Sequence, residues 1–301
     1  PGQGWPGPRE SDGERAMNWE PVTFPSLSHV LESLEGREWS CEHLVTRLLQ
    51  KKKTHTLEPD QIWMTQEGGE IAGLLFWGKS GLLLPYFPFL NRGEEEKKEY
   101  FTSLRNHLLE NHLPIHSIVG IRSYVQALSE ILQLEGGLQV EYYLMTREKE
   151  EPLPLIPEVP GFRTRPASLK DIEKILPLQI LYEKEEVLLQ PEYVDPGKTR
   201  KELESTLKEQ IVLMGEYRGV PVAKVGTNAR GIRYDQIGGV FTDLPYRGRH
   251  FARYLMIELL KTLKHQKKSA CLFVKNKNAA ALHLYEALQF KYREPFRIHY
   301  F

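Results

Sequence analysis

The sequence predicts an α/β protein with a mixed, largely antiparallel sheet flanked by helices in each of two halves. The chain has 301 residues, enough for two domains of about 150 residues each. Each half reads as strands followed by alternating strands and helices, the element order of a mixed sheet. Residues 148–160, which include four prolines, separate the halves and predict an extended linker.

The N-terminal half is predicted as a domain over residues 17–147. Apolar residues at helical spacing predict helices, and short apolar runs between turn residues predict strands. In chain order we expect helix 27–50, strands 61–65, 70–77 and 81–87, helix 94–111, strand 117–121, helix 124–134 and strand 140–146. Within this half Lys79, Pro85 and Pro88 interrupt the apolar residues 71–90, so two buried strands are expected rather than a membrane helix.

The C-terminal half, predicted as a domain over residues 161–301, repeats that element order. Ser168 and Asp171 have the spacing of a capping box, and the pair Arg218-Gly219 is typical of a hairpin turn. We expect strand 162–165, helices 169–178 and 198–210, strands 211–217, 220–227 and 232–242, helix 250–266, strand 270–274, helix 278–288 and a strand-rich tail 290–301.

The composition limits the functions of this fold. Hydrophobic residues make up 41% of the chain, which excludes general disorder. Forty basic and forty acidic residues give a net charge of zero, so we expect no nucleic-acid or membrane partner. Only Cys41 and Cys271 occur, which predicts a reduced, cytoplasmic protein without disulfides. No metal site is expected, because the histidines of the N-terminal half lack metal-ligand spacing: His29, His43, His55, His107, His112 and His116.

The first 16 residues differ from the rest of the chain. They contain four glycines and three prolines and have no apolar block. We therefore interpret them as a disordered leader, or a remnant of expression, that lies outside the fold.

The segment 236–252 is the most informative for function. A hydrophobic strand leads into a basic turn, and the turn opens an amphipathic helix. Free backbone N–H groups and the helix dipole favour an anion at such a place. Arg247, Arg249 and Arg253 add positive charge, and Gly248 lets a ligand approach the main chain. An ordinary strand–turn–helix with a solvated basic rim explains the same pattern about equally well.

This segment resembles the acetyl-CoA-binding motif of the GNAT N-acetyltransferase superfamily. Tyr246-Arg247-Gly248-Arg249 and Ala252 match that motif, whereas His250 replaces its central glycine. Because a residue at a helix start need not have positive φ, we expect His250 to be tolerated. A second motif of the same family lies in residues 271–290, with matches at Asn278, Ala281, Leu284, Tyr285, Glu286 and Phe290. The resemblance covers roughly residues 162–301 and implies a GNAT domain there.

The resemblance implies roles for individual residues. The main chain of Val240, Phe241 and Thr242 would bind the acetyl carbonyl and the pantetheine arm of acetyl-CoA. Asn278 would contact the same co-substrate, and Tyr285 would act as the general acid toward the leaving thiolate. A simpler alternative for Tyr285 is packing within an amphipathic helix. The backbone amides of the loop and of the first helical turn would hold the pyrophosphate. They begin at Arg247 or Gly248 and continue through Arg249, His250, Phe251 and Ala252 to Arg253.

The general base is harder to assign. Some members of the family carry a glutamate where this chain has Phe273. Asp235 is the nearest alternative acid, and three further candidates lie in the region that usually shapes the acceptor site: Glu183, Glu185 and Glu186. Each of these is more often a surface carboxylate, and deprotonation relayed by water would need no strong base.

The resulting prediction is a tandem protein with an acetyl-CoA-binding GNAT domain and a degenerate GNAT-like N-terminal domain. We expect direct acetyl transfer to a primary amine of a small molecule or peptide. The N-terminal half lacks both motifs and carries acidic residues 94–96 where a pyrophosphate would lie, so it would cover the acceptor cleft or mediate homodimerisation. Two alternatives stay open: a non-catalytic acyl-CoA sensor, and a tandem-GNAT aminoacyl transferase of the Fem type.

The zero net charge conceals an uneven distribution. Residues 241–301 contain twelve basic and four acidic side chains, so residues 1–240 contain 28 and 36. A basic C-terminal end suits a co-substrate that carries several phosphates.

Overall fold

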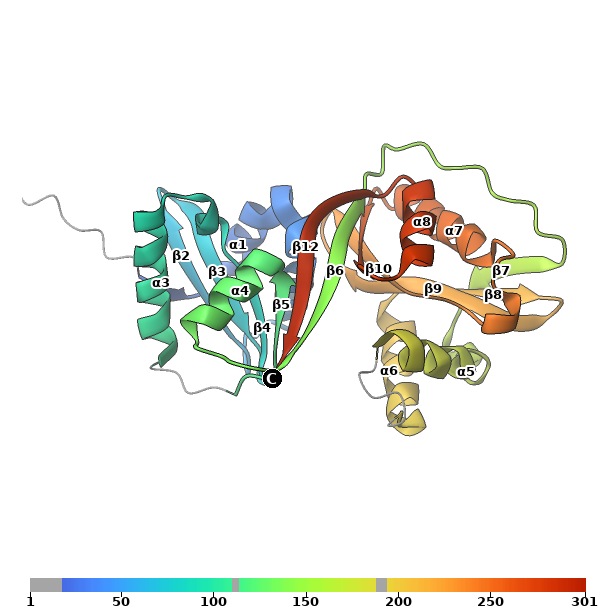
Figure 1. Cartoon of the computed structure of the whole chain (residues 1–301), viewed down its shortest axis with the longest axis horizontal. Coiled ribbons are helices and arrows are strands. Elements are labelled where there is room, and N and C mark those ends of the chain that lie inside the picture. The colour runs from blue at the N-terminus through green and yellow to red at the C-terminus, as the bar shows by residue number, and fades with distance from the viewer. Residues whose placement is uncertain (1–17, 110–113, 188–193) are drawn as a thin grey trace, which may run out of the picture.

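The computed structural model describes residues 18–109, 114–187 and 194–301 (Figure 1). The predicted leader, residues 1–16, lies outside the described residues. In the described part of the chain, none of the helices is both long and apolar enough to cross a membrane. The apolar run 71–90 instead forms two strands and the turn between them, as predicted.

One mixed sheet runs through both halves of the protein. Among the described residues it has twelve strands in the order β1-β2-β3-β4-β5-β12-β6-β11-β10-β9-β8-β7. Among these described strands, only the pairs β4–β5 and β10–β11 are parallel. The strands are β1 (Glu20–Pro21), β2 (Gln61–Glu67), β3 (Glu70–Trp77), β4 (Leu82–Tyr86), β5 (Ser117–Ile121), β6 (Leu138–Arg147), β7 (Phe162–Pro166), β8 (Val212–Tyr217), β9 (Val220–Arg230), β10 (Tyr234–Thr242), β11 (Ser269–Lys275) and β12 (Lys291–Tyr300). The predicted mixed, largely antiparallel sheet is confirmed.

The last strand of each half pairs with a strand of the other half. The chain leaves the N-terminal half through β6, which pairs with β11 of the C-terminal half. The final strand β12 returns to pair with β5 of the N-terminal half, and it also pairs with β6 along most of its length. Figure 1 shows β6 and β12 side by side between the halves. Residues 290–301 therefore complete the sheet of the other half, although they follow the C-terminal half in sequence.

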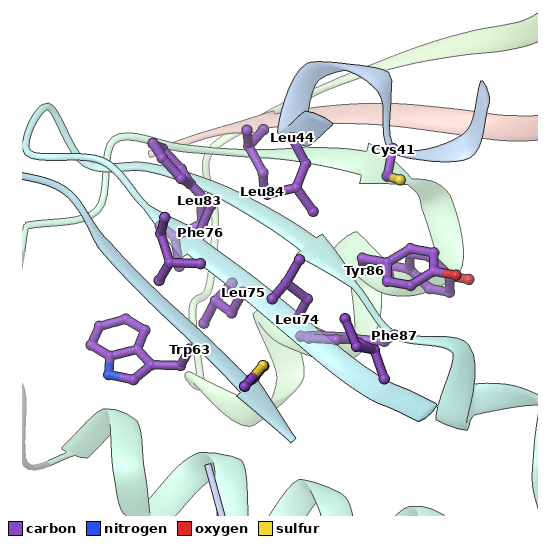
Figure 2. Packing of buried hydrophobic residues seen from close by; sticks show 14 of the residues in the cluster. Cys41, Leu44, Trp63, Leu74, Leu75, Phe76, Leu83, Leu84, Tyr86 and Phe87 are labelled. Carbon is purple, nitrogen blue, oxygen red and sulfur yellow. The ribbon is translucent and has the colours of Figure 1, made fainter. Parts of the chain in front are cut away.

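The N-terminal half packs helices on both sides of strongly buried strands. Its helices are α1 (Leu27–Leu34), η1 (Glu35–Ser40), α2 (Glu42–Thr54), η2 (Pro88–Asn91), α3 (Glu94–Leu109) and α4 (Arg122–Ile131). The predicted single helix 27–50 is wrong, because the 3-10 helix η1 interrupts it and Arg37 leaves the helical region with φ −127°. Figure 2 shows the core, in which Leu74, Leu75 and Phe76 of β3 are almost completely buried. Each such side chain contributes about 1.5–3 kcal/mol through burial.

The C-terminal half places two helices on each face of the sheet. In Figure 1, α5 (Ile172–Tyr182) and α6 (Pro196–Glu209) lie on one side, and α7 (Phe251–His265) and α8 (Ala279–Ala287) lie on the other. The predicted capping box of Ser168 and Asp171 is present. The hairpin pair Arg218-Gly219 has two positive φ angles, 51° and 84°, as a type I′ turn requires.

A glutamate of the N-terminal half also holds the C-terminal half. Glu38 in η1 accepts hydrogen bonds from the backbone N–H groups of Ile232 (2.6 Å), Arg233 (2.8 Å) and Tyr234 (3.3 Å). These three residues lie just before and at the start of β10. Hydrogen bonds to a buried carboxylate are stronger than those to neutral acceptors, so Glu38 anchors the position of β10 relative to the N-terminal half.

Candidate active site

Strands β10 and β11 part halfway along β10. Their parallel pairing ends where Ile237 lies opposite Leu272, but β10 continues to Thr242. The first four residues of β10 are buried, and the three that follow are half-buried. The predicted main-chain ligands at Val240, Phe241 and Thr242 therefore lie along a strand edge that β11 no longer covers. An extended ligand can add to such an edge as a further strand.

A β-bulge changes the course of β10 at the same place. Gly238 lies opposite Gly226, and Phe241 lies opposite Lys224. β10 therefore uses one residue more than β9 between these two pairs, which is the definition of a bulge. Gly239, inside the bulge, has φ +61°, a left-handed conformation that favours glycine.

Two side chains hold the bulge through the backbone of Gly239. The Nζ of Lys224 donates to the carbonyl oxygen of Gly239 at 3.0 Å, and the Tyr182 hydroxyl is hydrogen-bonded to the backbone of the same residue. Lys224 Nζ also lies 4.4 Å from the centre of the Tyr182 ring. A Cβ atom at position 239 would lie only 2.9 Å from Lys224 Nζ. The left-handed φ therefore favours glycine at position 239, and a larger residue there would also require Lys224 Nζ to shift.

Lys224 has an unusual environment for a lysine. Its side chain is 6% exposed, and burial lowers its pKa to about 7, although nearby Glu183 partly opposes this effect. Sequence reasoning missed Lys224, because a single lysine in a strand is usually solvent-facing. The available signal was its position among the apolar and small residues of segment 220–227.

The loop after β10 presents unpaired backbone donors. In the described part of the chain, none of the backbone amides from Gly248 through Arg253 donates a hydrogen bond, whereas Arg247 N donates to Leu244 O. Gly248 and His250 both have positive φ, 75° and 63°. The expectation that His250 would need no such angle is wrong, because it caps α7 in the left-handed conformation. The free amides lie at the positive end of the helix dipole, where an anion is stabilised.

The three arginines of this region have different partners. Arg247 donates to Thr242 O (2.9 Å) and forms an ion pair with Glu185 (2.6 Å), so its side chain is bound within the protein. The guanidinium of Arg249 lies over the rings of two tyrosines. By contrast, the buried Nε of Arg253 has no hydrogen-bond partner among the described residues. Arg253 therefore retains a donor for a ligand.

Helix α8 brings the second sequence motif to the same region. Asn278 caps the helix by accepting from Ala281 N (3.1 Å), and its Nδ2 donates to Glu186 (3.0 Å). Tyr285 is buried, and burial raises its pKa well above the ordinary value, with Tyr182 and Glu186 raising it further. Tyr285 thus lies near the residues that surround the bulge and stays protonated at neutral pH.

Asp235 lies away from this opening. It belongs to the paired part of β10, opposite Ala270 and Arg230, and it is completely buried. Its carboxylate forms an ion pair with Arg230 at 3.2 Å. Burial raises its pKa, and its electrostatic influence reaches Glu42 of the N-terminal half. The structure therefore does not bring Asp235 together with Tyr285.

The three acids of the described residues 183–187, which follow α5, all have partners. Glu183 accepts hydrogen bonds from Thr199 Oγ1 (2.5 Å) and Gln179 Nε2 (2.8 Å). Glu185 is paired with an arginine of the loop, and Glu186 is bound to an asparagine and to a lysine 3.4 Å away. Phe273, at the position where some GNAT enzymes carry a glutamate, stacks on Phe296 and His43.

Comparison with known proteins assigns the family of this site. Residues 178–290 match the model described as the acetyltransferase (GNAT) family. Residues 178–290 of the C-terminal half are therefore a GNAT domain, as the two motifs predicted. No curated protein matches the chain at a significant level.

Solved structures extend the likeness to almost the whole chain. A Drosophila protein superposes with a TM-score of 0.68 at 9% identity, over 95% of this chain and 99% of its own. A GCN5-related N-acetyltransferase from Sphaerobacter thermophilus gives 0.56 at 13% identity, over 95% of each chain. A tandem GNAT protein from the clavulanic acid biosynthesis pathway gives 0.55 at 11% identity, over 94% and 97%. The fold is a tandem GNAT-like fold, and its N-terminal half lacks the motifs.

Proposed function

We propose that the protein is an N-acetyltransferase that moves the acetyl group of acetyl-CoA directly to a primary amine in a ternary complex. The observation that carries this proposal is the row of unpaired amides from Gly248 to Arg253, beside the parted strands β10 and β11. The amides suit a pyrophosphate, and the open edge of β10 suits an extended pantetheine arm.

The residues of the loop fit this co-substrate. A Cβ atom at Gly248 would meet no atom within 4 Å, so the loop faces open space. The unpaired Nε of Arg253 and the buried, unpaired Oγ1 of Thr242 supply further polar contacts. Acetyl-CoA supplies a thioester, whose carbonyl carbon is open to an amine nucleophile.

The chain itself would supply orientation and proton transfer. The main chain of Val240, Phe241 and Thr242 is the proposed partner of the acetyl carbonyl and the pantetheine arm, and an amide donor near the acetyl oxygen would stabilise the negative charge that develops there. Tyr285 is the proposed acid, because a buried phenol is protonated at neutral pH and has one proton to give to the leaving thiolate. Holding both reactants in place can contribute about 7–11 kcal/mol in the best cases.

Release of free CoA thiol, measured over a panel of primary amines that includes small molecules and lysine peptides, tests this function. Transfer to at least one amine, with a melting temperature raised by acetyl-CoA, is the expected result. Tight binding of acetyl-CoA without turnover on any amine would favour the sensor instead, which the aromatic stacking of Phe273 in place of an acid motivates. Absence of any acetyl-CoA binding would revive the aminoacyl-transferase alternative.

A further inference from the structure

We propose that Lys224 is the general base that takes a proton from the acceptor amine, an inference that rests on the proposed acetyl transfer. Its Nζ lies beside the carbonyl of Gly239 at 3.0 Å, within the bulge where β10 separates from β11. The next residue, Val240, is the first of the proposed main-chain ligands of the acetyl group. Lys224 therefore lies one residue away from the strand edge on which the acetyl group is proposed to bind.

The three carboxylates of the described residues 183–187, which follow α5, already have partners, which favours Lys224 as the base. Glu183 receives two side-chain hydrogen bonds, Glu185 is held by Arg247, and Glu186 is held by Asn278. Each of these three carboxylates is therefore already engaged by a donor within the protein.

The groups around Lys224 allow it to be neutral near pH 7. Tyr182 faces it from α5, and Glu183 is the charged group that acts on it from the following turn. On the sheet, its neighbours are the Gly239 carbonyl, Phe241 and Met214. Burial lowers the pKa to about 7, so an appreciable fraction carries a lone pair at neutral pH. A neutral amine has two N–H donors and a lone pair. One N–H can serve the Gly239 carbonyl while the lone pair accepts a proton.

The proposed step balances in protons and electrons. The acceptor arrives as an ammonium ion and gives one proton to the lone pair of Lys224. The freed amine forms the C–N bond at the thioester carbon, and the C–S bond breaks with its electron pair on sulfur. Tyr285 gives its proton to the thiolate sulfur, and the resulting phenolate takes the second proton of the reacting nitrogen, so that Tyr285 ends the step protonated. Lys224 then returns its proton to the solvent.

Lys224→Arg separates a base from a structural lysine. Arginine keeps a cationic donor for Gly239 and for the Tyr182 ring, but it does not lose its proton in the accessible pH range. We expect kcat/KM to fall about 100-fold or more, with the dissociation constant of acetyl-CoA unchanged within about twofold. The wild-type fall of kcat/KM on the acid side, with a midpoint near pH 7, should be lost. Lys208→Arg, on the exposed face of α6, is the matched control and should behave like wild type.

The possible results are distinct. Full activity of Lys224→Arg with an intact acid limb would show that Lys224 only holds the bulge, and would overturn the inference. Absence of wild-type turnover on every amine would instead defeat the proposed function. If Lys224→Arg fails to fold, the Nζ titration in wild-type protein labelled with 13C at lysine Cε decides. A midpoint that matches the acid limb supports the base, and a midpoint near the ordinary lysine value of about 10.4 contradicts it.

Discussion

The two halves of the protein share one strand order, but they differ at the gap where their parallel strands separate. In each half, four antiparallel strands are followed by a fifth, which pairs in parallel with the fourth over a short contact before the two strands part. In the C-terminal half the gap opens on a glycine loop with free amides. In the N-terminal half β4 leads through η2 into α3, whose first turn contains three glutamates. That charge would repel a pyrophosphate.

The residues beside the gap of the N-terminal half also differ from those of the C-terminal half. Pro85 lies in β4 and has no N–H for a ligand, and its carbonyl oxygen would be 3.5 Å from a Cβ at Gly120 in β5. Phe89 stacks on the buried Tyr100 at 4.7 Å. The shared strand order therefore defines the scaffold, whereas the loop after the fourth strand of each half determines whether a co-substrate can bind. We therefore assign chemistry to the C-terminal half and support to the N-terminal half.

The largest expected effect lies at Tyr285. Tyr285→Phe removes the proposed proton donor and keeps the ring, so kcat should fall about 100-fold or more, while acetyl-CoA affinity stays nearly constant. Steady-state kinetics and calorimetry measure the two quantities. Tyr100→Phe, a buried tyrosine of the other half that bonds Glu67, should change stability but not kcat. An unchanged kcat in Tyr285→Phe would remove this residue from the mechanism and return it to simple packing.

A stability effect is expected from Glu42 of the N-terminal half. Its side chain is 1% exposed, and burial raises its pKa to about 8. The folded protein retains a proton that the unfolded chain loses above about pH 4.5, so this group makes folding less favourable as pH rises toward 8. Glu42→Gln should therefore gain roughly 3 kcal/mol over wild type at pH 7.5 and little at pH 4.5.

Denaturant unfolding at both pH values measures this difference. Exposed Glu35→Gln is the control and should show no such trend. If the advantage of Glu42→Gln is equal at the two pH values, Glu42 is ionised in the folded protein and the burial argument is wrong.

A smaller effect is expected from Arg253. Its unpaired Nε is a proposed donor to the phosphates of acetyl-CoA, and the loss of one charge-assisted hydrogen bond is worth about 1.5 kcal/mol. Arg253→Gln should weaken acetyl-CoA binding about tenfold in a calorimetric titration. Arg105→Gln, at an exposed position on α3, should have no effect. Equal affinities for both variants would place the phosphates elsewhere.

Much of this account could be predicted from the sequence, because it depends on local signals. Periodicity and turn residues determined most elements, and two short motifs indicated the loop around Gly248 and helix α8. The strand exchange could not be predicted, because it depends on which distant strand β12 pairs with. The role of Lys224 was hidden for the same reason, since its burial comes from α5, about 40 residues earlier in the chain.

Contacts between residues far apart in the sequence also explain why some site residues differ from the sequence-based expectation. The side chain of Arg247 looked free for a phosphate, but it is bound to Glu185, 62 residues away. Asn278 is similarly bound to Glu186, 92 residues away. The left-handed His250 was missed because its side chain gave no reason to expect positive φ.

Calorimetric titration of the full chain with acetyl-CoA tests the central claim most directly. We predict that one molecule of acetyl-CoA binds per chain. Gly248→Glu should weaken this binding about 100-fold or more, because a carboxylate would replace the open space in front of the amides. Gly69→Glu, at an equally open glycine of positive φ in the other half, should bind like wild type. Two sites per chain, or unchanged binding by Gly248→Glu, would contradict the assignment of the co-substrate to the C-terminal loop.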